Sequence, residues 1–278
     1  MPELHAQNRE FVWQPLARPL RTLSEAQAHS WDERGFFVIE DAFDAATLAE
    51  VVAETDHYEQ KMEAFLRTRE NGQLFIAKAG EITFAAHLSA RSPVLASFCA
   101  HPVFQGLCSE LIGPDVRLYW DQAVYKKSEP EREFPWHQDN GYTYVEPQCY
   151  LTCWVALSDA TQENGCPWLA PGLHRLGTLR HWTTELGFQC LKDVPDALPA
   201  PVRAGGIVVF SSLSPHRTGP NRTREARKAY IVQFAPDGAV RLEPDEQGGQ
   251  RRVPCDAPER QFPILVDGRP VAAPGVPA

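Results

Sequence analysis

The stretch Phe134-Pro135-Trp136-His137-Gln138-Asp139-Asn140 places a histidine and a carboxylate two positions apart. In an extended strand alternate side chains share a face, so His137 and Asp139 would lie together, with Cα atoms ~7 Å apart at ~3.3 Å per residue. Another histidine, His216, follows far downstream in Ser214-Pro215-His216-Arg217-Thr218. Two imidazoles and one carboxylate on one face of a metal are typical of non-haem Fe(II) oxygenases. We therefore predict a catalytic iron centre at His137, Asp139 and His216.

Other readings of these residues stay open at this point. A histidine and an aspartate at this spacing are common on polar strands, so the pair alone defines no site. A zinc enzyme of the cupin type, a hydrolase or isomerase, can hold Zn²⁺ with the same three ligands and activate water. A non-catalytic jelly-roll binding module would need no metal ligands at all.

A cation after the second histidine favours the iron enzyme. Arg227 lies eleven residues beyond His216, at the start of the next predicted strand. An iron oxygenase that uses 2-oxoglutarate holds one end of this diacid on the metal and must pair its distal carboxylate with a buried cation. The planar fork of arginine makes a bidentate contact that lysine cannot copy. Arg227 is the candidate for this contact, and Thr218 can add a hydroxyl donor.

Helix signals occupy the first part of the chain. Ser24 and Gln27 form a capping box, and Asp44 is the N-cap of a second helix. Pro93 and Pro102 open two further helices, because proline suits the first helical turn. From residue 116 onward the pattern is typical of strands. We expect strands at residues 36–39, 116–126, 150–157, 206–213 and 228–234.

Helices followed by strands favour an α+β class with a mainly β core, a β-barrel or jelly roll with a helical layer against one side. We expect a single domain over residues 1–278. Its accessory parts are an N-terminal arm at 1–21, a surface excursion at 237–262 and a closing hairpin at 262–271. The candidate substrate lids are the region 67–90 and the long connection 173–204, for which we expect some helix.

Composition narrows the class of protein further. The 278 residues carry a formal net charge of −9, and the pI is about 5.5. This balance favours neither nucleic acid nor an anionic membrane as a partner, and no apolar run approaches the ~18 residues of a membrane span. The seven cysteines form no C-x-x-C pair, which favours free thiols in a reducing compartment. With no signal peptide visible, we expect a cytoplasmic enzyme with a small-molecule substrate. Its oligomeric state has no indicator in the sequence.

Several short phrases together resemble one known family. They are Gly35–Phe43, Tyr125-Lys126, Phe134–Asp139, Cys153-Trp154, Glu163–Cys166, Pro171–His174 and His216–Arg222 with Arg227. Over roughly residues 30–236 the chain resembles the phytanoyl-CoA dioxygenase family of Fe(II)/2-oxoglutarate oxygenases. The resemblance implies a double-stranded β-helix, cupin-like, with a flanking N-terminal helical layer. It also implies that His137, Asp139 and His216 bind iron and that Arg227, Thr218, Lys126 and Trp154 hold 2-oxoglutarate.

The implied reaction consumes Fe(II)-bound 2-oxoglutarate and O₂, releases succinate and CO₂, and hydroxylates an unactivated C–H bond. Related halogenases have a small residue in place of the carboxylate, so Asp139 favours hydroxylation over halogenation. The sequence shows no strong basic cluster for the phosphates of coenzyme A, which favours a small metabolite as substrate. The candidates for lining its pocket are Gln122, Asn140 and Tyr142.

Overall fold

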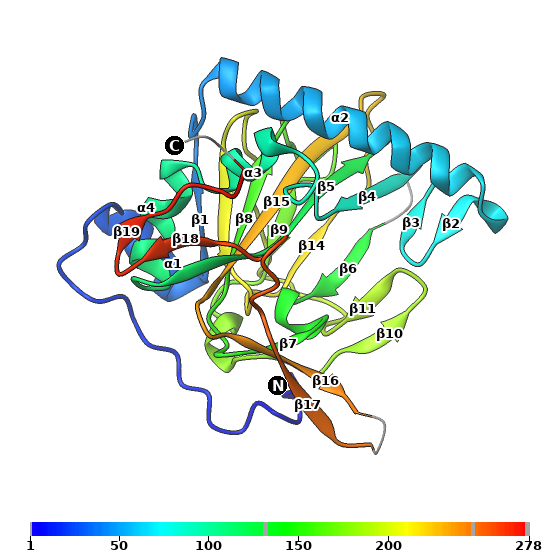
Figure 1. Cartoon of the computed structure of the whole chain (residues 1–278). Coiled ribbons are helices and arrows are strands. Elements are labelled where there is room, and N and C mark those ends of the chain that lie inside the picture. The colour runs from blue at the N-terminus through cyan, green and yellow to red at the C-terminus, as the bar shows by residue number, and fades with distance from the viewer. Residues whose placement is uncertain (1, 130–132, 246–247, 276–278) are drawn as a thin grey trace.

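The computed structural model describes residues 2–129, 133–245 and 248–275. Helices, a large sheet and a smaller sheet form successive layers, and the helices lie on one side of the large sheet (Figure 1). The neighbouring strands of the large sheet are antiparallel. Their order is β1 (Phe36–Ile39), β13 (Ile207–Ser211), β8 (Leu151–Ala156), β15 (Arg227–Pro236), β5 (Val116–Lys126), β4 (Ile82–Ala86), β3 (Ala77–Lys78) and β2 (Gln73–Leu74).

The smaller sheet faces the inner side of the large one. Its order is β12 (Leu198–Pro199), β9 (Pro167–Leu169), β14 (His216–Thr218) and β6 (Phe134–His137). Two further small sheets are built from β10 (Trp182–Thr184) with β11 (Gly187–Gln189), and from β17 (Gln250–Pro254), β16 (Val240–Pro244) and β7 (Tyr144–Glu146). At the other end, β18 (Pro263–Val266) pairs with β5 and with β19 (Arg269–Pro270).

The helical layer begins where the capping signals predict. The helices are α1 (Glu25–Arg34), α2 (Ala45–Arg67), α3 (Pro93–Cys99) and α4 (Pro102–Leu111), with 3₁₀ turns η1 (Glu70–Gly72), η2 (Asp139–Gly141) and η3 (Leu173–Leu176). The Ser24 capping box is present, and Gly35 ends α1 in the left-handed conformation at φ 82°. Helix α2 crosses β4 and β5, where Thr55 hydrogen-bonds the hydroxyl of Tyr125 at 3.0 Å (Figure 1).

Strand alternation explains why the large sheet has two buried faces. On β8, Cys153 and Val155 belong to the core beneath the helices, whereas Trp154 and Ala156 belong to a second core against the smaller sheet. Successive side chains of a strand point to opposite faces, so the fully buried strand Leu151–Ala156 serves both cores. The inner face of this sheet is therefore the one that looks toward β6 and β14.

Two accessory segments contain strands that the sequence did not predict. The connection 173–204 was expected to hold some helix, but it contains only the 3₁₀ turn η3 and is otherwise built around β10, β11 and β12. The segment 237–262, expected as a surface excursion, contributes the β16–β17 hairpin, and β16 pairs with β7 next to the metal-ligand loop. The pairings of β12 with β9 and of β16 with β7 join residues far apart along the chain, which short-range periodicity does not report.

The N-terminal arm is hydrogen-bonded to the connection 173–204. The backbone N–H of His5 donates to the carbonyl of Thr178 at 2.9 Å, and Leu4 forms a β-bridge with Leu179. The Asn8 amide donates to the carbonyls of Leu176 and Thr178 at 2.7 and 3.0 Å. Figure 1 draws this arm in dark blue, with its end beside β16 and β17.

Candidate metal centre and substrate cavity

The two predicted histidines meet because β6 and β14 are antiparallel neighbours with His137 opposite His216. Strand β6 ends at His137, but Gln138 remains extended at φ −107° and ψ 145°, so the alternation still brings Asp139 to the same side. One ligand atom from each of His137, Asp139 and His216 lies within 4.8 Å of the other two. This is the spacing of atoms that share one metal ion.

Backbone carbonyls orient both imidazoles. Nδ1 of His137 lies 2.8 Å from the carbonyl oxygen of Pro135, and Nδ1 of His216 lies 3.1 Å from that of Ser214. A carbonyl oxygen only accepts hydrogen bonds, so Nδ1 carries the proton in each ring and Nε2 keeps its lone pair. The Nε2 atoms are therefore available to a metal, as in other histidine metal sites.

A relay of polar side chains from the large sheet holds the carboxylate. Thr152 Oγ1 on β8 donates to Asp139 Oδ2 at 2.6 Å, and Gln233 Nε2 on β15 donates to Thr152 Oγ1 at 3.2 Å. The other carboxylate oxygen, Oδ1, lies 3.7 Å from Nε2 of His216. One oxygen of Asp139 is thus anchored while the second faces the imidazoles.

Burial sets the charges of these groups. It lowers the pKa of His137 to about 3, with the neighbouring His216 as the second cause, and it lowers the pKa of His216 to about 4. Both rings are therefore neutral at pH 7, the form that binds metal. Burial also raises the pKa of Asp139, a shift that the charge of a bound divalent cation opposes.

Arg227 is the first residue of β15 and is 1% exposed. Its Nε and Nη1 atoms are buried and have no hydrogen-bond partner among the described residues. Its guanidinium carbon lies 5.0 Å from the ring centre of Trp154, and burial lowers its pKa to about 10, so it stays cationic at neutral pH. A buried guanidinium with free donors is costly unless an anion pairs with it, so these atoms suit the distal carboxylate of 2-oxoglutarate.

Lys126 lies opposite Arg227 in the strand register and is buried. Its ammonium group donates to the carbonyl of Gly219 at 2.5 Å, which holds it next to the residue that follows Thr218. Burial, and then the charge of Arg227, lower the pKa of Lys126 to about 7. Lys127, the sequence neighbour that competed for this position, points to the other face and pairs with Glu59 and Glu63 on α2 at 3.0 and 2.8 Å.

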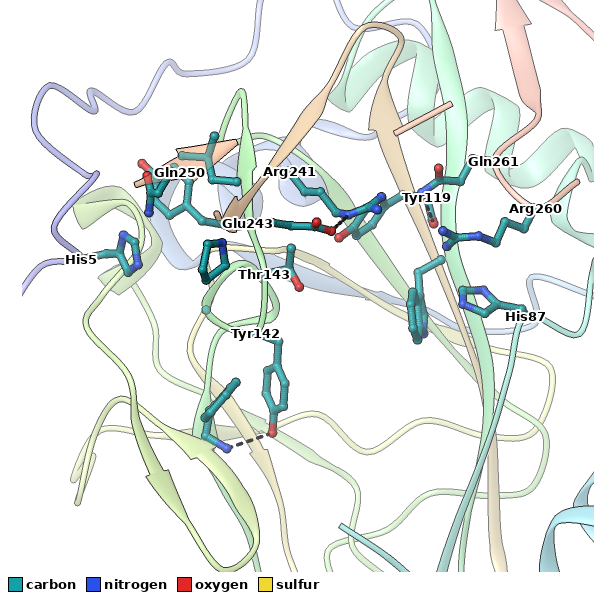
Figure 2. Close-up of a pocket in the computed structure, with 16 residues that line it drawn as sticks. His5, His87, Tyr119, Tyr142, Thr143, Arg241, Glu243, Gln250, Arg260 and Gln261 are labelled. Atoms are coloured by element: carbon teal, nitrogen blue, oxygen red, sulfur yellow. Dashed lines mark hydrogen bonds and ion pairs between the residues drawn. The ribbon is translucent and has the colours of Figure 1, made fainter. Parts of the chain in front are cut away.

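The three predicted pocket residues are placed differently. The ring of Tyr142 packs edge-on against His137, with centroids 5.4 Å apart. Tyr142 also lines a cavity of about 560 Å³ (Figure 2). Asn140 is fully buried, and its side chain bonds to Thr178 Oγ1 at 2.6 Å and to the backbone of Val145 at 3.0 Å. These bonds give Asn140 a structural duty in the loop. Gln122 is half-buried on β5 and does not line this cavity.

Segments from the whole length of the chain build the cavity. Its aromatic walls are Tyr119, Trp120, Tyr142, Tyr144 and Phe188, and its charged side chains are Arg241, Glu243 and Arg260. His5 of the N-terminal arm reaches it and stacks on Tyr144, with ring centroids 4.7 Å apart (Figure 2). The regions 67–90 and 173–204, predicted as lids, contribute His87 and Phe188.

Sequence reasoning missed the residues that support the site. Thr152 and Gln233 carried one usable signal, since each is a polar residue inside a strand that is otherwise buried. His5, Arg241 and Arg260 carried none, because their segments show no motif and meet the cavity only through tertiary contacts.

Comparison with known proteins bears on the class. A family model for phytanoyl-CoA dioxygenase (PhyH) matches residues 31–229. Phytanoyl-CoA dioxygenase domain-containing protein 1 of Rattus norvegicus is 27% identical over 261 residues, 76% of this chain and 90% of that protein. Methylphosphonate hydroxylase of Gimesia maris is 25% identical over 218 residues, 77% of this chain and 81% of that protein. The crystal structure of the non-heme alpha ketoglutarate dependent carbocyclase SnoK from nogalamycin biosynthesis has a TM-score of 0.65 at 22% identity, covering 84% of this chain and 95% of that chain.

Fold and site together define a non-haem iron- and 2-oxoglutarate-dependent oxygenase with a double-stranded β-helix. Within that class the chain belongs to the phytanoyl-CoA dioxygenase family, whose model matches well over half of its residues. The predicted family, fold and cofactors are confirmed. Among the described residues, no helix combines the length and the apolar character needed to cross a bilayer.

Proposed function

We propose that the protein is a hydroxylase that uses Fe(II), 2-oxoglutarate and O₂ to oxidise an unactivated C–H bond of a small-molecule metabolite. The observation that carries this is one arrangement of side chains. His137, Asp139 and His216 converge within 4.8 Å, and a buried guanidinium with unpartnered donors, that of Arg227, lies on the facing sheet. A zinc hydrolase would leave that guanidinium without a duty.

When bound, iron and 2-oxoglutarate supply the oxidising power for breaking the C–H bond. The chain's own residues bind and orient. His137 and His216 present neutral Nε2 atoms, Asp139 presents Oδ1, and the Thr152 hydroxyl anchors the other carboxylate oxygen, Oδ2. Arg227 fixes the far carboxylate of the co-substrate, with Lys126, Trp154 and Thr218 around it. Phe134 and Tyr142 pack on His137 and help to exclude bulk water.

Two features favour hydroxylation of a compact substrate. Asp139 occupies the position that a halide would need on the metal, which disfavours halogenation. The cavity of about 560 Å³ falls in the range of ~300–1,000 Å³ typical of small-molecule sites. Named relatives and structural neighbours include a hydroxylase and a carbocyclase, so analysis of the product has to separate these outcomes.

The decisive experiment measures succinate formation from 2-oxoglutarate by the iron-loaded protein in air. We expect Asp139→Ala to abolish succinate formation while the fold remains intact by circular dichroism, because the iron site loses the carboxylate of its protein triad. Arg227→Leu should still bind iron but require about tenfold to a hundredfold more 2-oxoglutarate, as expected for a lost charge-assisted contact.

The exposed Arg224 provides a matched control, since Arg224→Leu removes the same charge three residues earlier without touching the site. That variant should behave as wild type. Succinate formation at the wild-type rate by Asp139→Ala, or an unchanged 2-oxoglutarate requirement in Arg227→Leu, would overturn the assignment. Two measurements complete the test: the metal content of the purified protein and its 2-oxoglutarate-dependent O₂ uptake. A zinc enzyme would contain zinc and show no such uptake.

A further inference from the structure

The cavity beside the metal ligands is connected to them by a row of side chains on the inner face of the large sheet. Trp120 on β5 lies opposite Gln233 on β15, and Gln233 donates to Thr152, which donates to Asp139. Trp120 and Tyr142 both line the cavity. A molecule held against these two rings would therefore lie next to the iron ligands Asp139 and His137.

The charged side chains that line the cavity differ in how well ion pairs neutralise them. Arg241 Nε donates to Glu243 at 2.5 Å, and Arg251 donates to the same carboxylate at 2.5 and 3.0 Å, so Glu243 is fully compensated. Arg260 forms an ion pair with Glu259 at 3.8 Å, and the Glu259 side chain is 66% exposed. Such a contact contributes little in water. Arg260 is itself only 26% exposed, which leaves its guanidinium able to bind an anion inside the cavity.

His87 lies beside Arg260 at this end of the cavity (Figure 2). Its ring packs edge-on against Trp120, with centroids 4.2 Å apart, and its backbone adopts φ 56°, a left-handed conformation that few residues other than glycine take. The backbone N–H of His87 is held by the carbonyl of Asp121 at 2.8 Å. Burial, and then the charge of Arg260, lower the pKa of His87, so at pH 7 it is a neutral imidazole beside a cation.

Tyr119 also lines the cavity, and the charges of the metal site and of Arg260 both act on it. The charges of Asp139 and Arg260 act on this phenol in opposite directions, the first raising and the second lowering its pKa, although burial is the largest cause of its raised pKa. The lining of the cavity thus includes Tyr142, which packs on His137, and the cation Arg260.

We propose that the substrate carries an acidic group, a carboxylate or a phosphonate, that Arg260 binds next to His87. The carbon skeleton of the substrate then lies on Trp120 and Tyr142, which directs a C–H bond remote from the acid toward the iron. This inference rests on the proposed function and names its substrate class. A chain with a net charge of −9 does not attract anions as a whole, so a local guanidinium has to select them.

Arg260 lies outside residues 31–229, the part of the chain that the family model matches. His5 and Arg241 also come from outside that range and also line the cavity. The shared β-helix therefore supplies the iron site, and segments beyond it supply the selection of substrate. This division explains how the anion site is compatible with a general oxygenase centre.

The test uses the full chain loaded with iron and 2-oxoglutarate under anaerobic conditions. The probes are three acids, hexanoate, phenylacetate and phenylphosphonate, each paired with its neutral amide or ester. Binding is followed by tryptophan fluorescence and by the rise in melting temperature that a ligand of the folded state produces. Comparison of phenylacetate with phenylphosphonate decides which acid the site prefers.

We expect wild type to bind acids more tightly than their neutral partners, and Arg260→Gln to weaken acid binding about tenfold to a hundredfold. Arg260→Lys, which keeps the charge but not the planar fork, should recover part of the affinity. The matched control is Arg269→Gln, which removes the same charge from an exposed arginine that does not line the cavity and should leave binding unchanged.

Three results would overturn the inference. They are equal binding of acids and neutral partners by wild type, unchanged acid binding in Arg260→Gln, or failure of every acid to bind wild type. The baseline formation of succinate from 2-oxoglutarate separates this failure from failure of the proposed function. If succinate still forms and depends on Asp139 while acids do not depend on Arg260, the oxygenase stands and the anion site does not.

Discussion

At the scale of single residues, the site depends on how its ligands are aimed as much as on which they are. Two carbonyls orient the imidazoles of His137 and His216, and one hydroxyl orients Asp139. The contact from this hydroxyl was the hardest of the three to predict from the sequence, because Thr152 belongs to the opposite sheet and shares no motif with the ligands. Outer hydrogen bonds of this kind tune metal affinity as well as ligand geometry.

Replacing Thr152 by valine tests that link. The change keeps the shape of the side chain but removes the donor to Asp139 Oδ2, so we expect Fe(II) affinity to fall about tenfold to a hundredfold. Equilibrium competition with a metal chelator measures the affinity. Thr55→Val is the matched control, since Thr55 is also fully buried and hydrogen-bonded but lies on α2 beneath the outer face of the sheet. Equal iron affinities in the two variants would refute the orienting role.

At the scale of elements, segments outside the β-helix complete the cavity. The arm is held through Asn8, whose amide spans two carbonyls of the connection 173–204 and accepts from Gln148 Nε2 at 3.3 Å. The hairpin β16–β17 is held through β7, which follows the metal-ligand turn η2. Both attachments converge on Tyr144, where His5 stacks. The substrate cavity is thus a product of docking between distant elements.

We expect Asn8→Ala to loosen the arm, because the carbonyl of Leu176 loses its donor and that of Thr178 keeps only the one from His5. The free energy of unfolding should fall by about 1–3 kcal/mol. Urea denaturation measures this loss, and limited proteolysis reports whether the N-terminal segment becomes accessible. Gln14→Ala serves as the control in the same arm, since its amide donates only locally to Val12 at 3.3 Å. If both variants keep wild-type stability and protease resistance, the arm is not anchored as described.

At the scale of the whole molecule, the layered fold buries several histidines and so keeps them neutral. Burial lowers the pKa of His137 to about 3 and those of His174, His181 and His216 to about 4, from an ordinary value of 6.5. At a pH between the lowered pKa values of the folded protein and the ordinary value of 6.5, the unfolded chain binds more protons than the folded one. Stability from these groups is therefore complete above pH 6.5 and is lost as the pH falls toward 4.

For the metal-free protein we expect a steep loss of stability below pH 6.5. Each histidine that takes a proton only on unfolding contributes a slope of about 1.4 kcal/mol per pH unit. His174 allows a matched test, because it lies against Trp13 and is not one of the metal ligands. His174→Phe should reduce the slope by about one proton in urea titrations at pH 7 and pH 5. An unchanged slope would show that His174 is not held neutral by the fold.

Local chemistry in the sequence was sufficient for the iron ligands and the helix starts. The His137–Asp139 alternation, the histidine after a buried strand, and the caps at Ser24 and Asp44 all act over a few residues. Strand alternation survives in the fold because it is set by the backbone itself. The position of Arg227 at the start of the strand after His216 was also predictable, and its contact with 2-oxoglutarate stays a prediction.

Tertiary structure alone decided the rest. It turned Lys126 inward and Lys127 toward α2, assigned Asn140 to the loop, and placed Arg260 beside His87. The physical reason is that these relations join residues far apart along the chain, whose meeting depends on sheet pairing and packing rather than on local propensity. Sequence therefore determined the chemistry of the iron centre, and the docking of the arm and the hairpin determined the cavity beside it.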